Sequence, residues 1–177
     1  MGFYCNNCGK YHNDLPLSYN VPTPIHWRYK YKWERHSELG TDLCVIRGEN
    51  FFIRGNVEIP IIDSDEIFGY SVWVSLSQQN FERTRELWFE PKRVEEEPYF
   101  GWFSSQLPNY PDTINLKTLV HTRPVGIVPY IELEGTDHPL AVEQREGITM
   151  ERVQEIAELN LHHDNDKSVP FWKRLLR

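Results

Sequence analysis

The clearest alternation of hydrophobic and polar residues in this chain lies between residues 43 and 76. Within 67–76, large apolar side chains occupy every second position, which is typical of a strand with one buried face. Gly48-Glu49 and Gly55-Asn56 have the form of two-residue hairpin loops, because glycine reaches positive φ without a steric clash. The polar run at 63–66 indicates a third reversal. The pattern therefore predicts four consecutive strands in an antiparallel meander.

Hydrophobic periodicity also predicts two helices and two later strands. A capping box that begins at Ser75 predicts a helix over 78–90, and an amphipathic pattern after a capping threonine predicts another over 149–161. Strands are predicted at 116–122 and 127–134. The expected fold class is α+β: an antiparallel meander with the later strands, packed by two main helices and preceded by an N-terminal segment of zinc-knuckle form.

The chain has 177 residues, which suits one domain with a single hydrophobic core. We expect a globular domain over residues 1–161 and a C-terminal tail over 162–177. The tail ends in the apolar and basic stretch 171–177, which is short enough to favour docking on the body or disorder over membrane contact. No apolar run reaches the roughly 20 residues of a membrane helix, and no leader-like pattern is present. The expected location is the cytoplasm.

The overall charge of the chain argues against nucleic acid as its main partner. The formal net charge is -7, whereas contacts with phosphate groups need clustered Lys and Arg. One stretch, 25–33, alternates basic and aromatic residues as single-stranded nucleic-acid binders do. The stretch is predicted to be a strand or an irregular segment, and we interpret its alternation as that of a half-buried strand with a basic outer face. We therefore expect neither nucleic acid nor a membrane as partner, which leaves another protein.

The most specific chemical feature is Cys5-x-x-Cys8-Gly9, which has the form of a zinc knuckle. In such a turn two thiolates converge on one metal ion, and the glycine supplies positive φ. Structural zinc takes four ligands, so one cysteine pair is half a site. We predict that His12 and Cys44 complete it, with zinc as a structural cofactor.

Three alternatives stay open for these residues. His26 or His36 could replace His12 as the histidine ligand. The thiols could be free and buried, because three cysteines is an odd number that suits a reducing compartment better than a disulfide framework. A redox role is the third alternative, although a redox Cys-x-x-Cys normally follows a strand and opens a helix, and few residues precede Cys5.

Familiar catalytic signatures are absent from the sequence: it has no nucleophile elbow, phosphate loop, dinucleotide fingerprint or His-Glu-x-x-His. Asp137-His138 could act as an oriented general base, but a histidine before proline in a turn is more often structural. We therefore predict no catalytic residues and a non-enzymatic cytosolic protein-binding module, for instance an inhibitor or immunity protein whose acidic surface covers a basic target. The alternative is a metal-dependent hydrolase, in which water takes one zinc position and Asp137-His138 or Glu143 serves as base.

Eight short motifs along the chain share one resemblance. They are Cys5-x-x-Cys8-Gly9 with His12, Leu15-Pro16-Leu17, Asp42-x-Cys44-Val45-Ile46, Phe52-Ile53-Arg54-Gly55, Val72-Trp73-Val74-Ser75-Leu76-Ser77, Tyr99-Phe100-Gly101-Trp102, Tyr110-Pro111-Asp112-Thr113 and Asp137-His138-Pro139-Leu140-Ala141. Together they resemble the bacterial domain of unknown function 2199, over roughly residues 3–160. The resemblance implies a bacterial origin and assigns no activity. Because its motifs include the three cysteines and His12, it favours the zinc prediction.

Overall fold

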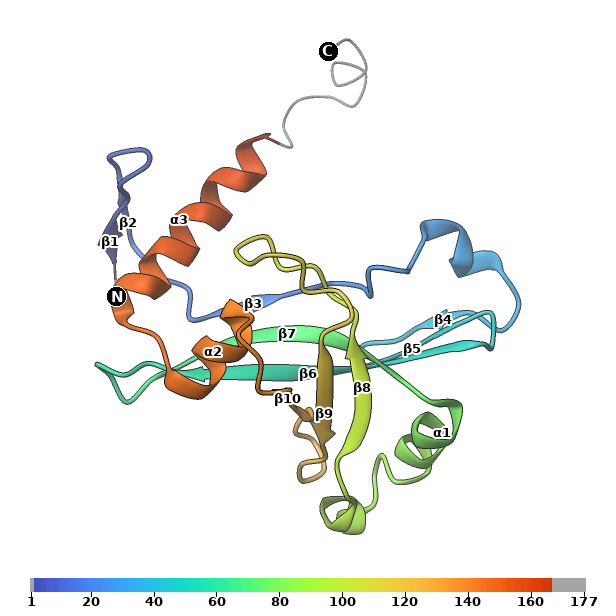
Figure 1. Ribbon diagram of the computed structural model, residues 1–177. Helices are drawn as coiled ribbons and strands as arrows, with labels where there is room; N and C mark the ends of the chain where they lie inside the picture. Colours follow the sequence, from blue (N-terminus) through green and yellow to red (C-terminus); the bar gives the residue numbers. More distant parts are fainter. Residues whose placement is uncertain (1, 167–177) are drawn as a thin grey trace.

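Six strands build the centre of the fold. The structure, a computed structural model, describes residues 2–166. The six strands are β5 (Leu43–Ile46), β6 (Asn50–Pro60), β7 (Ile67–Leu76), β8 (Tyr99–Phe103), β9 (Lys117–His121) and β10 (Tyr130–Leu133). Each pairs antiparallel with the next, and β10 then pairs in parallel with β6. Strands β6 to β10 therefore close into a five-stranded barrel where an open meander was expected (Figure 1).

One of the predicted hairpin loops, Gly55-Asn56, is not a turn. Both residues lie inside the continuous strand β6, which pairs with β7 on either side of them. A Cβ added at Gly55 would lie 2.6 Å from Ile131 Cδ1 and 2.8 Å from the carbonyl oxygen of Pro129. Glycine is needed because β10 approaches the backbone of β6 closely where the barrel closes. Residues 43–76 therefore form three strands, and the prediction of four was wrong.

The other two predicted reversals are present. The reversal predicted at Gly48-Glu49 is a three-residue connection, 47–49, in which Arg47 and Gly48 have φ values of 59° and 69°, the positive values that a tight hairpin requires. The polar run 63–66 lies in the connection between β6 and β7. At these two places the glycine and the polar residues therefore mark reversals of the chain, as the sequence predicted.

Within the described residues, three α-helices accompany the barrel: α1 (Gln78–Glu86), α2 (Pro139–Glu146) and α3 (Met150–Asp166). Both predicted helices are present as α1 and α3. The cap of α1 is Ser77 and not Ser75, and α1 ends before the predicted residue 90, where the 3-10 helix η2 (Pro91–Glu95) follows. Helix α2 lies where only a turn was expected, and β8 was not predicted.

Helix α3 matters most for the candidate site. The Thr149 Oγ1 accepts a hydrogen bond from Arg152 N at 3.2 Å, which is the predicted N-cap. Val153, Ile156 and Ala157 are fully buried on its inner face. The helix continues past the predicted domain boundary at 161, so His162, which the sequence analysis placed in the tail, belongs to the helix. The apolar stretch 171–177 lies outside the described residues.

The stretch 25–33 does not form the predicted strand. Its second half is the 3-10 helix η1 (Tyr29–Trp33), which contains no buried residue. Trp27 and Tyr31 pack on a small core cluster under β5 and β6, whereas the rings at the two ends of η1 face solvent. Trp27 and Tyr31, which face the core, are therefore four positions apart, and so are Tyr29 and Trp33, which face solvent. Alternating aromatics satisfy both periods, so the sequence pattern alone could not distinguish a strand from a helical turn.

Four short strands complete the structure: β1 (Phe3–Tyr4), β2 (Tyr11–His12), β3 (Ser18–Asn20) and β4 (Glu38–Leu39). β1 and β2 form a separate antiparallel hairpin, whereas β3 pairs with β7 and β4 with β5. The hairpin lies beside α3 at one end of the molecule, and η1 with β4 lies at the other end (Figure 1).

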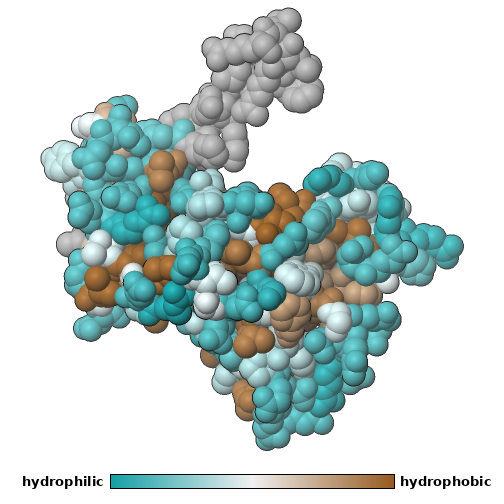
Figure 2. All heavy atoms as spheres, viewed as in Figure 1, coloured by the Kyte–Doolittle hydropathy of each residue, from teal (hydrophilic) through white to brown (hydrophobic). Residues whose placement is uncertain are grey.

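The face of the molecule drawn in Figure 2 is mostly hydrophilic. Hydrophobic residues gather on it in several separate patches, with hydrophilic residues around them. In the part of the chain that the structure describes, no helix is both long and apolar enough to cross a lipid bilayer.

Candidate metal centre

The two knuckle cysteines lie in the turn of the β1–β2 hairpin. The Cys5 N donates a hydrogen bond to the Lys10 carbonyl oxygen at 3.0 Å, and the Gly9 N donates to the Cys5 carbonyl oxygen at 2.9 Å. Gly9 has a φ of 66° and open space around an added Cβ, so its backbone conformation is what calls for glycine. Cys5 is buried and Cys8 is exposed. The knuckle form that the sequence indicated is present.

A histidine from the other end of the described chain joins the pair. The His162 Nε2 lies 3.0 Å from the Cys5 Sγ, and the ligand atoms of Cys5, Cys8 and His162 all lie within 4.8 Å of one another. Two ligands of one tetrahedral zinc ion lie about 3.5 Å apart, given metal–ligand bonds of about 2.0–2.3 Å. The three atoms therefore need only small movements to hold one metal ion.

The predicted ligand His12 lies next to this group. Its Nε2 is 3.5 Å from the Cys8 Sγ, and its ring stacks on Phe3 with centroids 5.2 Å apart. His12 is not within 4.8 Å of all three other ligand atoms, so it lies at the edge of the group. Neither His26 nor His36 belongs to any metal-binding group among the described residues.

The structure does not bring Cys44, the other predicted ligand, to the knuckle. Cys44 lies on β5 opposite Phe52 and packs in a core cluster with Trp73, separate from the cluster that holds Cys5. Burial, together with the charge of Glu38, raises the pKa of the Cys44 thiol to about 12. A neutral thiol in an apolar cluster is a packing residue, because metals bind the thiolate. The β1–β2 hairpin instead contacts α3, while Val21 packs on the cluster that contains Cys44.

One face of α3 holds the hairpin through three residues spaced four apart. Gln154 Nε2 donates to the Tyr4 carbonyl oxygen at 3.0 Å, and Glu158 Oε1 accepts from the Asn6 N at 2.8 Å. His162 follows one turn later on the same face. The helix therefore contacts the backbone on both sides of Cys5 as well as its sulfur, which fixes the imidazole relative to the knuckle.

Glu158 is the carboxylate that these contacts place beside the knuckle turn, since it accepts hydrogen bonds from Asn6 and Gln154. Burial raises its pKa, but hydrogen bonds from Asn6 and Gln154 and the charge of His162 outweigh that effect and hold the pKa below its usual value. A general base for neutral pH needs a pKa raised toward 7. Glu158 is therefore an anchor for the hairpin and not a suitable proton acceptor.

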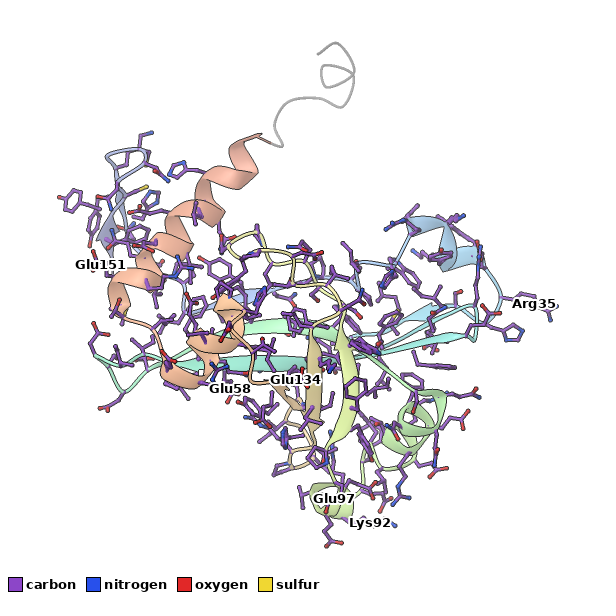
Figure 3. All side chains as sticks on the ribbon, in the orientation of Figure 1. Arg35, Glu58, Lys92, Glu97, Glu134 and Glu151 are labelled. Atoms are coloured by element: carbon purple, nitrogen blue, oxygen red, sulfur yellow. The ribbon has the colours of Figure 1, made fainter. Side chains whose placement is uncertain are left out.

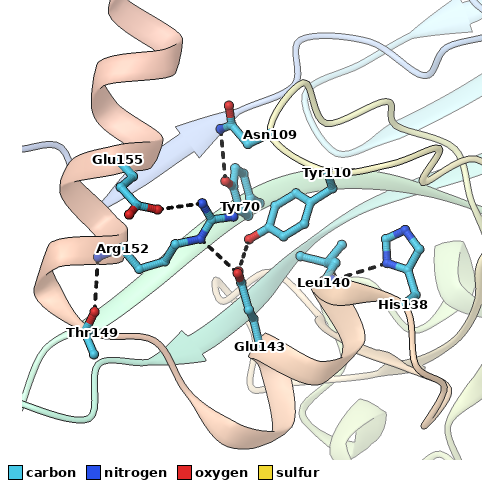
Figure 4. A network of polar contacts seen from close by, with 9 residues as sticks. All are labelled: Tyr70, Asn109, Tyr110, His138, Leu140, Glu143, Thr149, Arg152 and Glu155. Carbon is cyan, nitrogen blue, oxygen red and sulfur yellow. Dashed lines mark hydrogen bonds and ion pairs between the residues drawn. The ribbon is translucent and has the colours of Figure 1, made fainter. Parts of the chain in front are cut away.

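The two candidate bases from the sequence lie elsewhere. His138 caps α2: its Nδ1 accepts a hydrogen bond from Leu140 N at 3.2 Å. Glu143, on α2, accepts hydrogen bonds from the Tyr110 hydroxyl and from Arg152 Nε of α3. Figure 4 shows Glu143 in a polar network that joins α2, α3 and the loop that holds Tyr110, and His138 in a separate contact with Leu140. Both side chains are thus engaged in structural contacts.

The same network predicts a loss of stability at high pH. Burial raises the pKa of Tyr70 to about 12, from an ordinary value near 10, and burial also raises that of Tyr110. Below pH 10 both tyrosines are protonated in the folded and unfolded chains, and their contribution is fully present. As the pH rises from about 10 to about 12, the unfolded chain loses these protons first, so the free energy of unfolding falls.

Thermal unfolding measured across this range should show the melting temperature falling, and Tyr70→Phe should make the fall shallower. Tyr29→Phe, a change at an exposed tyrosine, should keep the wild-type dependence. Equal slopes for wild type and Tyr70→Phe would contradict the assignment.

Sequence reasoning missed His162, although a signal for it existed. Gln154, Glu158 and His162 are four residues apart on an amphipathic helix, which places three polar side chains on one face. The sequence alone did not say what that face contacts. The ligand therefore became recognisable only when the hairpin was seen beside α3.

Comparison with known proteins identifies one family. Its sequence model, described as an uncharacterized protein conserved in bacteria (DUF2199), matches residues 4–148. No curated protein and no solved structure matches the chain. The matched range contains Cys5, Cys8 and His12 and ends before α3, so His162 lies beyond it.

Proposed function

The chain belongs to this family of uncharacterized bacterial proteins, and we propose that it is a non-enzymatic protein-binding module held together by one structural zinc ion. The ligands in this proposal are Cys5, Cys8, His12 and His162. The observation that carries it is the convergence of two sulfurs and one imidazole from opposite ends of the described chain, with a second imidazole 3.5 Å from one of the sulfurs.

The ligand types favour zinc. Thiolate and imidazole together suit Zn²⁺, and a Cys₂His₂ set of four is a closed structural site. Such a site leaves no coordination position for a substrate or a reactive water. Its effect is to tie the N-terminal hairpin to α3, and the binding free energy then contributes to folding. A reducing cytoplasm would keep both thiols available for the metal.

The surroundings of the group support a structural role. A cavity of about 380 Å³ lies along the adjoining face of α3, lined by Asn6, Met150, Glu151, Gln154 and Glu155. None of the three grouped ligands lines it. A substrate in this cavity would therefore meet amide, methionine and acidic residues, and not the metal ligands.

Binding through charge is the activity that the remaining features support. The chain has a formal net charge of -7, and exposed glutamates such as Glu97, just before β8, and Glu151, on α3, lie on separate parts of the molecule (Figure 3). A partner with a basic surface would be attracted by this field. The protein would then act by covering its partner, as an inhibitor or immunity protein does.

A metal-dependent hydrolase is the second candidate, because His12 lies at the edge of the group. If His12 does not bind, three protein ligands and one water would form an open site. The base is the difficulty for this candidate, since Glu158 has a lowered pKa and both His138 and Glu143 are engaged in α2 contacts.

X-ray absorption spectroscopy of the zinc-loaded full chain separates the two candidates. We expect two sulfur and two nitrogen ligands, and His12→Ala should replace one nitrogen by oxygen. Cys44→Ala is the matched control and should leave the spectrum unchanged. A wild-type spectrum with one nitrogen and one oxygen, unaffected by His12→Ala, would instead support the hydrolase.

A further inference from the structure

The segment from residue 25 to 37 projects from the end of the molecule opposite the metal centre (Figure 1). Tyr29 and Trp33 are 73% and 67% exposed, and their rings meet edge to face with centroids 4.7 Å apart. We call this segment the basic–aromatic lobe. Large aromatic rings are usually mostly buried, so a pair of them held in solvent needs an explanation.

The exposed rings are held by an anchor beneath them. Trp27 and Tyr31 pack on the core cluster under β5 and β6 and contact each other with centroids 5.8 Å apart. The Arg47 guanidinium lies over the Tyr31 ring, 5.2 Å from its centroid, and also pairs with Glu34 at 2.6 Å. The lobe is therefore a supported platform, and its outward rings are presented in a defined arrangement.

Positive charge surrounds the exposed rings. Arg28, Lys30, Lys32 and Arg35 are all exposed, and among the described residues none of them has a carboxylate within 4.0 Å. The one acidic residue between them, Glu34, is already paired with Arg47. Figure 3 shows Arg35 pointing away from the body, with the labelled glutamates elsewhere on the molecule. The lobe is thus locally basic on an acidic protein.

A cavity of about 640 Å³ opens beside the rings. Its walls are Thr23, Trp27, Tyr29, Lys32, Ser37, Glu38 and Leu39. The volume is in the range of small-molecule sites and is ample for a nucleobase. Aromatic walls next to a lysine suit a flat ring whose chain carries negative charge, although Glu38 reduces the positive potential on one side.

We propose that the basic–aromatic lobe binds single-stranded nucleic acid. Bases stack on Tyr29 and Trp33 or enter the adjoining cavity, and Arg28, Lys30, Lys32 and Arg35 neutralise the phosphates between them. Stacking rings interleaved with cations are the general means of binding a single strand without reading its sequence.

The acidic remainder of the protein does not prevent such binding, because exposed charges more than about 8 Å away are largely screened at physiological ionic strength. This activity is independent of the proposed metal centre. The sequence favoured a half-buried strand over nucleic-acid binding for the basic and aromatic pattern of 25–33, and the structure instead shows a 3-10 helix with no buried residue over Tyr29–Trp33.

An acidic peptide would bind the same cations, but its acidic side chains have no flat ring to stack on the two exposed aromatic residues. The test therefore compares the two ligands on the full chain. A fluorescein-labelled oligothymidylate of about 12 nucleotides, within the usual size of single-stranded sites, should bind, with log affinity falling against log salt with a slope of about −2 to −3 for four cations. An unlabelled polyglutamate peptide should compete only weakly.

Variants of the lobe give the decisive readout. Tyr29→Ala and Trp33→Ala should each weaken binding about tenfold or more, and Lys30→Gln with Lys32→Gln should make the salt slope shallower by about 1 to 2. Phe89→Ala, at an aromatic residue 80% exposed on another part of the surface, should change neither, and every variant should keep its circular dichroism spectrum. The proposal would be overturned if the oligonucleotide did not bind at low salt, if Tyr29→Ala and Trp33→Ala both left the affinity unchanged, or if polyglutamate competed as well as unlabelled oligonucleotide.

Discussion

Removal of the metal is expected to lower the melting temperature of this protein by about 10–20 °C. The contact between Cys5 and His162 joins residues 157 positions apart. A cross-link that closes so long a loop removes about 5 kcal/mol of chain entropy from the unfolded state. For a chain of this size each kcal/mol shifts the melting temperature by about 2–4 °C. Protein purified without added zinc should contain about one equivalent of metal, and a strong chelator should produce the shift.

Single ligand substitutions sharpen this test. His162→Ala should abolish the response to chelator and reproduce most of the lowered melting temperature, because it removes the ligand that ties α3 to the hairpin. Cys44→Ala is the control: it also removes a buried thiol and costs packing energy, yet it should keep the metal and the chelator response. Protein that contains no metal and melts identically with and without chelator would end the idea.

Replacing Gly55 by alanine is expected to cost about 3 kcal/mol or more of folding free energy. The new methyl group would lie 2.6 Å from Ile131 Cδ1 and 2.8 Å from the Pro129 carbonyl oxygen. The isoleucine can shift, but the carbonyl belongs to the backbone leading into β10, so the strand that closes the barrel must move. Urea unfolding of the variant should show a lower midpoint with an unchanged slope.

Gly69→Ala provides the matched control. Gly69 lies on β7, opposite Glu58 of β6, and its added Cβ would meet only the Val57 carbonyl oxygen, at 3.6 Å. That distance is an ordinary contact, and alanine lowers the entropy of the unfolded chain. Gly69→Ala should therefore be neutral or slightly stabilising. Equal destabilisation by the two variants would contradict the view that Gly55 is required by barrel closure.

Features determined by neighbouring residues were predictable from the sequence. The strict alternation of 67–76 predicted β7, and the residues at Gly48 and Thr149 predicted a hairpin turn and a helix cap. Cys5-x-x-Cys8-Gly9 predicted a knuckle, because its turn depends on the conformation of a few adjacent residues. Backbone preferences and short-range hydrogen bonds act between residues that are close in sequence, so a short stretch of sequence is enough to predict them.

Features that depend on contacts between residues far apart in the sequence were decided only by the tertiary structure. Gly55 looks like a turn residue until β10 is seen packed against it, and the aromatic residues of 25–33 fit a strand until their anchor on the core shows which rings face out. His162 is separated from Cys5 by nearly the whole described chain, and Cys44, closer in sequence, packs elsewhere. Close packing of a folded chain brings such residues together or keeps them apart, and no local pattern records the distance between segments that meet only after folding.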